Sequence, residues 1–306
     1  MTKRTAYIYL TFIGSLLILT LGWYAASFLA QPPVGNREPD PVFFDSSHAH
    51  ADVQTQVAFG PRIPGSAGHA QVEAWIRTEL ESAGWNVEVH ESERMGHPIR
   101  NIIAKRNDEA PQIILGAHYD TRMIADNDPD MSKRSEPVPG ANDGASGVAV
   151  LLELARSLSN DIIPTWLVFF DTEDNGRIEG WDWILGSRAF AEEIPVAPRA
   201  VVVVDMIGDA DLNIYLERNS NVVIRNEIWS IAENLGYDKQ FINQEKYSME
   251  DDHTPFLEAG IPAVDIIDFD YPYWHTTQDT PDKVSAESLQ AVGETLWNWV
   301  AGQTKR

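Results

Sequence analysis

The chain has 306 residues, of which 43% are hydrophobic and 23% charged, a composition that excludes disordered and fibrous proteins. Its 46 acidic and 23 basic residues give a formal net charge of −23, a field that repels phosphate backbones, so we do not expect nucleic acid as a partner. The absence of cysteine excludes disulfides and thiolate nucleophiles, so any bound metal must be held by His, Asp and Glu.

A long apolar stretch stands near the amino terminus. Residues 6–30 carry no charge and follow Lys3 and Arg4. Since roughly 20 apolar residues cross a bilayer as a helix, we expect a single-pass transmembrane anchor over 6–30, with residues 1–5 as a cytoplasmic tip and the rest extracytoplasmic. Small residues near Ala30 leave a cleaved signal peptide, and hence a secreted protein, as the alternative. A linker rich in Pro and Gly over 31–45 then precedes one catalytic domain over 46–303.

The body of the chain alternates between two patterns. Three short and nearly continuous apolar runs are typical of strands covered on both faces: 112–117, 165–170 and 200–205. Apolar residues at helical spacing predict helices in four places: 72–83, 144–158, 224–235 and 285–300. This alternation predicts an α/β domain around a mostly parallel sheet, whose ligands collect at the carboxyl ends of the strands.

Acidic and histidine side chains follow the predicted strands or stand in comparable positions: His118, Asp120, Asp143, Glu173, Asp174, Asp205, Asp251, Asp252, His253 and His275. Taken singly, an Asp before Gly is usually a turn or a helix cap, and a carboxylate at a strand end is usually solvated. Several such groups at one edge of a sheet indicate a metal ion instead, because buried like charges do not help packing.

The ligand types indicate which metal and which chemistry. Two histidines with several carboxylates and no sulfur suit Zn²⁺ in an open catalytic site. In the pair Glu173-Asp174, neighbouring side chains on an extended strand end diverge, so one carboxylate can bind the metal while the other transfers protons. The glycine-rich segment 140–147 lacks the Lys-Ser/Thr of a phosphate loop, so no nucleotide is expected, and its glycines let Asp143 approach the metal.

Five histidines stand in polar or poorly patterned sequence, and we expect them at the surface: His48, His50, His69, His90 and His97.

Six segments, taken in order, resemble the zinc sites of the M28 clan, which holds zinc aminopeptidases and the animal-type glutaminyl cyclases: 117–120, 140–147, 169–174, 205–208, 251–256 and 274–276. The resemblance covers about residues 60–300. It implies a zinc-exopeptidase-like fold, a three-layer α/β/α sandwich around a central mixed sheet.

The resemblance implies two alternative metal centres. In the aminopeptidases two zincs share five ligands, which match His118, Asp143 as the bridge, Asp174, Asp205 and His275, with Glu173 as general base. In the cyclases one zinc is bound, and the matching ligands are Asp143, Asp174 and His275. Because all five positions are filled here, ligand identity does not separate the two activities.

Three local features favour the cyclase. The pair Asp251-Asp252 before His253 and the Trp274 before His275 resemble cyclase segments. The stretch 180–188 resembles one that supplies a pocket tryptophan, here Trp181. The Glu-Asp pair at 173 and 174 departs from the Glu-Glu of the animal enzymes and looks like the bacterial relatives.

The cyclase interpretation assigns roles to these residues. The substrate is the N-terminal Gln of a peptide or protein, which closes to pyroglutamate with loss of ammonia. Glu173 moves the proton, while Asp205 and Asp251 hold protonated forms through short hydrogen bonds between carboxyl groups. Trp274, Trp181 and Asp252 bind the substrate. A di-zinc aminopeptidase is the alternative, and a membrane-tethered binding domain without chemistry is disfavoured by the complete ligand set.

Overall fold

The computed structural model describes residues 43–303. The expected tip at 1–5, the anchor at 6–30 and nearly all of the linker at 31–45 lie outside these residues. Within the described part, no helix combines the length and the hydropathy needed to cross a bilayer.

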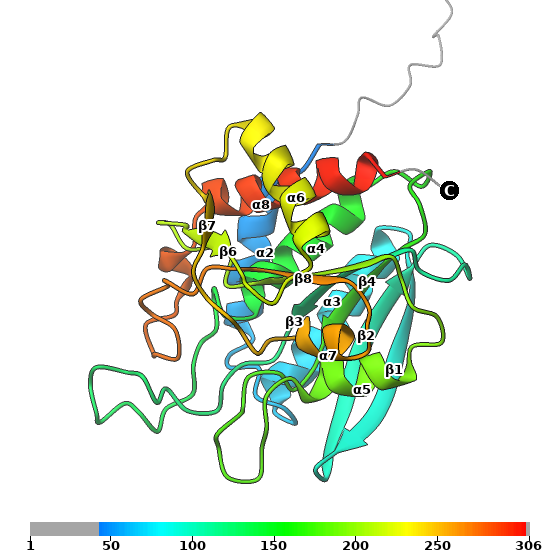
Figure 1. Ribbon diagram of the computed structural model, residues 1–306. Helices are drawn as coiled ribbons and strands as arrows, with labels where there is room; N and C mark the ends of the chain where they lie inside the picture. The colour runs from blue at the N-terminus through cyan, green and yellow to red at the C-terminus, as the bar shows by residue number, and fades with distance from the viewer. Residues whose placement is uncertain (1–42, 304–306) are drawn as a thin grey trace, which may run out of the picture. The chain divides into compact units, whose positions relative to one another are not determined.

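A six-stranded sheet with the order β1-β2-β4-β3-β5-β8 forms the centre of the domain (Figure 1). Its strands are β1 (Asn86–Arg94), β2 (His97–Lys105), β3 (Ile113–His118), β4 (Thr165–Phe170), β5 (Ala200–Asp205) and β8 (Ala263–Ile267). β4, β3, β5 and β8 run parallel, while β1 and β2 join the sheet antiparallel. The predicted mixed sheet is therefore confirmed, and the three predicted strands lie within one residue of their apolar runs.

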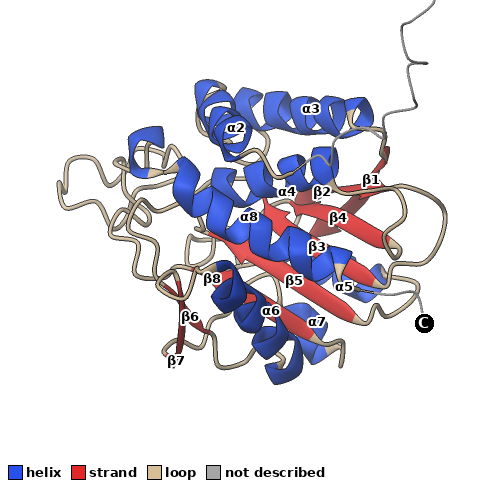
Figure 2. Cartoon of the chain, turned by 90° about the horizontal axis from the view of Figure 1, so that it is seen from above, coloured by secondary structure: helices blue, strands red, loops and turns tan. Residues whose placement is uncertain are grey.

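Helices cover both faces of this sheet (Figures 1 and 2). One face carries α2 (Ser46–Ala58), α3 (Ala67–Ser82), α4 (Ala145–Ser157), α6 (Val222–Leu235) and α8 (Ala286–Ala301); the other carries α5 (Leu185–Glu193) and α7 (Thr254–Glu258). A two-stranded parallel sheet of β6 (Ile214–Leu216) and β7 (Phe241–Glu245) and a 3₁₀ turn, η1 (Pro281–Lys283), complete the described elements. The three-layer arrangement agrees with the expectation.

The side chains of the central strands alternate between the two helical layers. In β5, Val202 and Val204 pack in the cluster with α4 and α8, whereas Val201 and Val203 pack with α5 and α7. All four are essentially fully buried, and burying such a side chain contributes about 1.5–3 kcal/mol. This two-sided burial gives the carboxyl ends of the strands a rigid base.

The hairpin of β1 and β2, like β8, is not among the strands predicted from the sequence. Its turn at Met95-Gly96 places both residues in the left-handed region, with φ of 53° and 83°. β1 is half-buried at best and carries mostly polar side chains, so it lacks the apolar run that identifies the inner strands.

Candidate active site and metal centre

The residues expected at the strand ends do meet at one edge of the sheet. His118 and Asp205 are the last residues of β3 and β5, and Glu173 and Asp174 follow β4. Asp143 lies in the turn before α4, Asp251 shortly before α7, and His275 in the loop after β8. Chain segments far apart in sequence are thus joined at a single place.

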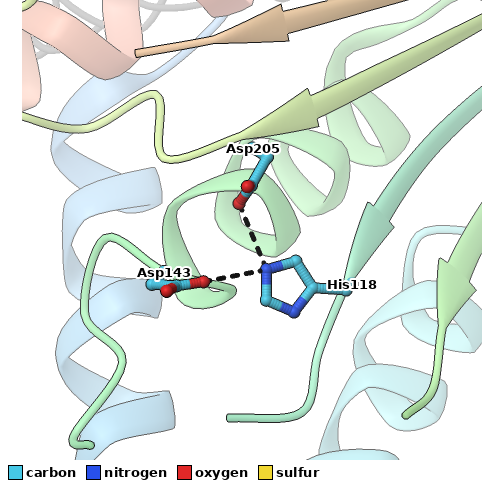
Figure 3. A group of neighbouring side chains, drawn as sticks. All are labelled: His118, Asp143 and Asp205. Carbon is cyan, nitrogen blue, oxygen red and sulfur yellow. Dashed lines mark hydrogen bonds and ion pairs between the residues drawn. The ribbon is translucent and has the colours of Figure 1, made fainter. Parts of the chain in front are cut away.

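The first group consists of His118, Asp143 and Asp205 (Figure 3). Nε2 of His118 lies 3.2 Å from Oδ1 of Asp143 and 3.1 Å from Oδ1 of Asp205. The two carboxylates approach the same ring nitrogen from different elements, as Figure 3 shows. All three side chains are buried.

The second group shares Asp143 with the first and adds Asp174 and His275. Nε2 of His275 lies 2.8 Å from Oδ1 of Asp174 and 3.8 Å from Oδ2 of Asp143. Within each group the candidate ligand atoms all lie within 4.8 Å of one another. Asp143 therefore stands between two sets of ligands, each large enough for one ion.

Both groups fit a zinc ion by their donor chemistry. Oδ2 of Asp143 and Oδ2 of Asp174 are buried without a hydrogen-bond partner, a costly arrangement that a cation would relieve. Burial lowers the pKa of His275, but the nearby carboxylates of Asp174, Asp126 and Asp143 outweigh burial and raise that pKa to about 9. Imidazole and carboxylate ligands without sulfur suit zinc.

Backbone strain concentrates at this site. Thr172, Met206 and His275 all have left-handed backbones, with φ of 59°, 48° and 57°. Such conformations cost about 1–3 kcal/mol each and persist only where the surroundings hold them. Here the carbonyl oxygens of Thr172, Met206 and His275 accept hydrogen bonds from Leu185, Asn142 and Asn127. The chain thus turns sharply at or beside Glu173, Asp205 and His275.

Gly144 allows the close approach of Asp143 to the strand ends. Its φ is 93°, and a Cβ atom there would lie 2.8 Å from the carbonyl oxygen of Asp120 and 3.2 Å from Cε1 of His118. Only glycine meets both demands. The expectation that glycines bring Asp143 to a helix start therefore agrees with the structure.

Two carboxylates that were not predicted as metal ligands hold the site in place. Asp120 accepts hydrogen bonds from the backbone nitrogens of Glu173 (2.9 Å) and Asp174 (3.3 Å). Asp279 does the same for Asn142 (2.8 Å) and Asp143 (3.1 Å). Asp120 and Asp279 both stand close to motif residues in the sequence. The sequence pattern, however, does not distinguish an Asp that supports the site from an Asp that binds the metal.

Arg122 contacts Asp174 directly and His275 through Asp126, and so connects two members of the second group. Its guanidinium donates to the carbonyl oxygen of Asp174 at 2.9 Å and to both carboxylate oxygens of Asp126 at 2.8 Å. Asp126 in turn lies 3.5 Å from Nδ1 of His275. This contact orients the imidazole so that Nε2 faces the metal position.

Glu173 is the carboxylate placed for proton transfer. It is buried, lines the cavity described below, and lies 3.8 Å from Nδ1 of His118. Burial raises its pKa well above the ordinary value, and the charges of Asp174, Asp252 and Asp251 add to that effect. A raised pKa suits a group that must both take and return a proton near neutral pH.

The active-site cavity has a volume of about 360 Å³ and opens over the second metal group. It is lined by Asp143, Glu173, Asp174, Arg177, Trp183, Asp205, Met206, Tyr247, Ser248, Met249, Glu250, Asp251, Ile267, Phe269, Trp274 and His275. The rings of Trp183 and Trp274 stack near His275, with centroid distances of 5.9 and 3.8 Å. The imidazole ring of His275 and the two indole rings thus form one wall of the cavity.

Two expected substrate contacts are not found at the cavity. Trp181 stacks on His97 at 3.5 Å and packs against Ile99 and Leu185, away from the lining residues. Trp183, two residues later, takes the cavity position instead. Asp252 is fully buried and is not among the residues that line the cavity, whereas the adjacent Asp251 is.

The expectation that Asp205 and Asp251 take part in short hydrogen bonds between carboxyl groups stays a prediction. Both side chains line the cavity. Burial raises the pKa of Asp205 to about 7, and the charge of Asp251 adds to this effect.

A third buried group comprises Asp251, which lines the cavity, with His253 and Asp265. Nε2 of His253 lies 3.5 Å from Oε2 of Glu217, and its Nδ1 lies 3.8 Å from Oδ2 of Asp265. Glu217 is held by four donors: the backbone nitrogens of Asn219, Ser220 and Met249 and the hydroxyl of Ser220. These bonds fix the segment that carries Met249 into the cavity wall.

We expect Glu217→Gln to lower the free energy of unfolding by about 3 kcal/mol at pH 7. Burial raises the pKa of Glu217, but the contact with His253 and the backbone donors outweighs burial and lowers it to about 2. A depressed folded-state pKa stabilises the protein above the unfolded value near 4.5, and this contribution is lost as the pH falls toward 2.

Urea titrations of wild type and Glu217→Gln between pH 7 and about pH 2 measure this effect. The exposed Glu233→Gln in α6 is the matched control and should leave stability within about 0.5 kcal/mol. Equal stability of Glu217→Gln and wild type at pH 7 would contradict the structural role of Glu217.

The expectation of surface positions fails for His69. This residue is only 6% exposed, and its Nε2 lies 2.7 Å from Oδ1 of Asp171. Its ring stacks on Tyr119 at 5.0 Å. His69 stands in the first turn of α3, on the side that faces the sheet. The apolar spacing that predicts this helix begins only at Val72, so the sequence pattern does not mark His69 as buried. His48 is exposed, and the other three are half-buried: His50, His90 and His97.

The fold and the site together define a class of protein: α/β/α enzymes with a metal centre at the carboxyl edge of a mixed sheet. Residues 101–300 match Peptidase family M28, and the chain belongs to that family. It is therefore a zinc-dependent enzyme, and its buried His/Asp clusters are candidate zinc sites.

Known relatives carry both activities of the family. The chain is 26% identical over 284 residues to the glutaminyl-peptide cyclotransferase of Boiga irregularis, covering 77% of this chain and 75% of the relative. The crystal structure of Porphyromonas gingivalis glutaminyl cyclase is similar with a TM-score of 0.80 and 35% identity, over 85% of this chain and 99% of that one. A leucine aminopeptidase precursor from Bacteroides thetaiotaomicron is similar with a TM-score of 0.82 and 32% identity, over 87% and 99%.

Proposed function

We propose that this chain is a zinc-dependent glutaminyl-peptide cyclotransferase that converts the N-terminal Gln of peptides and proteins to pyroglutamate and ammonia. The observation that carries the proposal is the small cavity in which Glu173 stands beside the ligand group Asp143, Asp174 and His275 under two indoles. The cyclotransferase relatives support it.

The reaction is an intramolecular substitution at the substrate's own amide. The α-amine attacks the side-chain carbonyl carbon, a C–N bond closes the five-membered ring, and the bond to the departing nitrogen breaks. Because both reactants belong to one residue, holding them in contact supplies much of the rate. The protein must therefore fold the side chain back and move one proton.

Asp143, Asp174 and His275 would hold the zinc. Zinc bound there supplies Lewis acidity toward a carbonyl oxygen. Glu173 takes the proton from the attacking amine and returns it to the leaving nitrogen, so the carboxylate ends each cycle unchanged. Asp205 and Asp251 line the same cavity and orient the α-amine, which attacks in its neutral form, through hydrogen bonds.

The aromatic residues of the cavity wall also exclude water from the reaction. Water in the place of the amine would hydrolyse the side-chain amide and give Glu instead of pyroglutamate. Trp183 and Trp274, with Phe269 beside Trp274 at 4.9 Å, pack against the substrate methylenes and exclude water from the reacting carbon.

A di-zinc aminopeptidase remains the second candidate, because a specific group of residues favours it. His118, Asp143 and Asp205 form a further ligand set whose members are within 4.8 Å of one another. Two zincs about 3.5–4 Å apart would suit the activation of a hydrolytic water.

The product of a Gln-initiated peptide separates the two candidates. Mass spectrometry should show loss of ammonia from the intact peptide, and a Leu-initiated peptide should remain uncleaved. Release of free Leu or Gln without the cyclised product would assign the aminopeptidase activity instead.

We propose in addition that residues 6–30 anchor the enzyme in a membrane with its catalytic domain on the extracytoplasmic side. The uncharged stretch after Lys3 and Arg4 supports this proposal. Full-length protein should fractionate with membranes and resist carbonate extraction, whereas release into the medium after cleavage would favour a signal peptide.

A further inference from the structure

The charges around the active-site cavity are strongly one-sided. Its lining includes six carboxylate side chains: Asp143, Glu173, Asp174, Asp205, Glu250 and Asp251. Arg177 is the one Lys or Arg side chain among the described residues that line it. With a chain charge of −23 behind it, this cavity favours a cationic amine and repels an anionic peptide.

Arg177 is the exception to this field, and it is free to bind a ligand. Its side chain is exposed, and within residues 43–303 its guanidinium forms neither a salt bridge nor a hydrogen bond. The neighbouring cations are all occupied: Arg122 binds Asp126, Arg188 binds Glu250 and Glu258, and Lys246 binds Asp270.

The backbone at Arg177 is held in an unusual conformation. Its φ is 63°, in the left-handed region that a side chain other than glycine adopts at a cost. The loop is fixed on both sides, because Arg122 donates to the carbonyl oxygen of Gly176 at 3.2 Å and Trp181 donates to that of Ile178 at 2.9 Å. The protein thus maintains a strained turn that places a free guanidinium at the cavity.

We propose that Arg177 is a specificity-determining residue that binds a carboxylate of the peptide just beyond its N-terminal Gln. The inference rests on the proposed function, which puts the Gln side chain against Glu173 and the metal ligands and directs the rest of the peptide out past the cavity mouth. The carboxylate is either an acidic side chain at the second position or the C-terminal carboxylate of a dipeptide. A planar guanidinium suits both, since it binds carboxylates through two parallel hydrogen bonds.

The test compares kcat/KM for matched peptide pairs with the zinc-loaded full-length enzyme. Gln-Glu-Ala amide against Gln-Gln-Ala amide probes the side-chain carboxylate, and Gln-Gly against Gln-Gly amide probes the terminal one. We expect wild type to prefer at least one acidic member, and Arg177→Gln to lose about 5-fold on that member, through KM, with no change on its neutral partner.

Two further variants sharpen the result. Arg177→Glu should reverse the preference toward Gln-Lys-Ala amide. Arg199→Gln removes the same charge just before β5, at the opposite end of that strand from Asp205, and should leave both ratios at the wild-type value.

The outcomes are distinct. Equal losses on acidic and neutral peptides, an unchanged ratio in Arg177→Gln, or no acidic preference in wild type would each overturn the role of Arg177, while cyclisation of Gln-Gln-Ala amide would still support the proposed function. Failure of wild type to cyclise any of these peptides would overturn the proposed function, and this inference with it.

Discussion

Glu173→Gln is expected to lower the turnover of a Gln-initiated peptide by about 10²–10⁴-fold while the protein keeps its zinc. The substitution preserves the size of the side chain and removes its ability to accept a proton. Glu173 is the carboxylate next to the metal ligands that is not itself in either ligand group, so its loss should reach the chemistry and not the metal.

Single-turnover kinetics with metal analysis of the same sample measure this prediction. Glu179→Gln, an exposed position in the same loop, is the matched control and should retain wild-type turnover. Because the amide removes a buried carboxylate whose ionisation burial disfavours, Glu173→Gln should also be at least as stable as wild type. Full turnover in Glu173→Gln would contradict both enzyme interpretations.

The second prediction uses a pair of variants to decide how many metals the reaction needs. Asp174→Asn weakens the group that contains His275, and we expect it to lose zinc and activity together. His118→Asn weakens the other group, which shares only Asp143 with the first. For a cyclase with one zinc, His118→Asn should keep its zinc and lose no more than about tenfold in kcat.

Zinc per chain after dialysis, with kcat on the same samples, gives the answer. Loss of one of two zincs in His118→Asn, together with loss of peptide hydrolysis, would establish the di-zinc alternative. Zinc retention at the wild-type level in Asp174→Asn would remove Asp174 from the ligand set in either case.

Much of the sheet and of its reactive edge could be predicted because the inner strands carry unusual sequence. Residues 165–170 and 200–205 are nearly all apolar because both faces of these strands are buried, as is typical of a covered parallel sheet. Their carboxyl ends necessarily share one edge. The meeting of Glu173 and Asp205 at one cavity follows from that topology.

The features that escaped prediction depend on tertiary contacts. Trp181 and Trp183 differ by two positions in a loop that has left-handed residues at Arg177, Gly180 and Ile184, and only Trp183 lines the cavity. Asp251 and Asp252 are adjacent, yet one lines the cavity and the other is buried. Periodicity carries no information about loops of this kind.

The position of Asp120 limits how the active site can change by substitution. The Asp120 carboxylate accepts hydrogen bonds from the backbone amides of both Glu173 and Asp174. The positions of the proton carrier and of a candidate metal ligand therefore depend on the same side chain. A substitution that moves Asp120 would displace Glu173 and Asp174 together and could not shift one of them alone. Variation among functional descendants should therefore accumulate at the rim, where Arg177 stands, and spare this anchor.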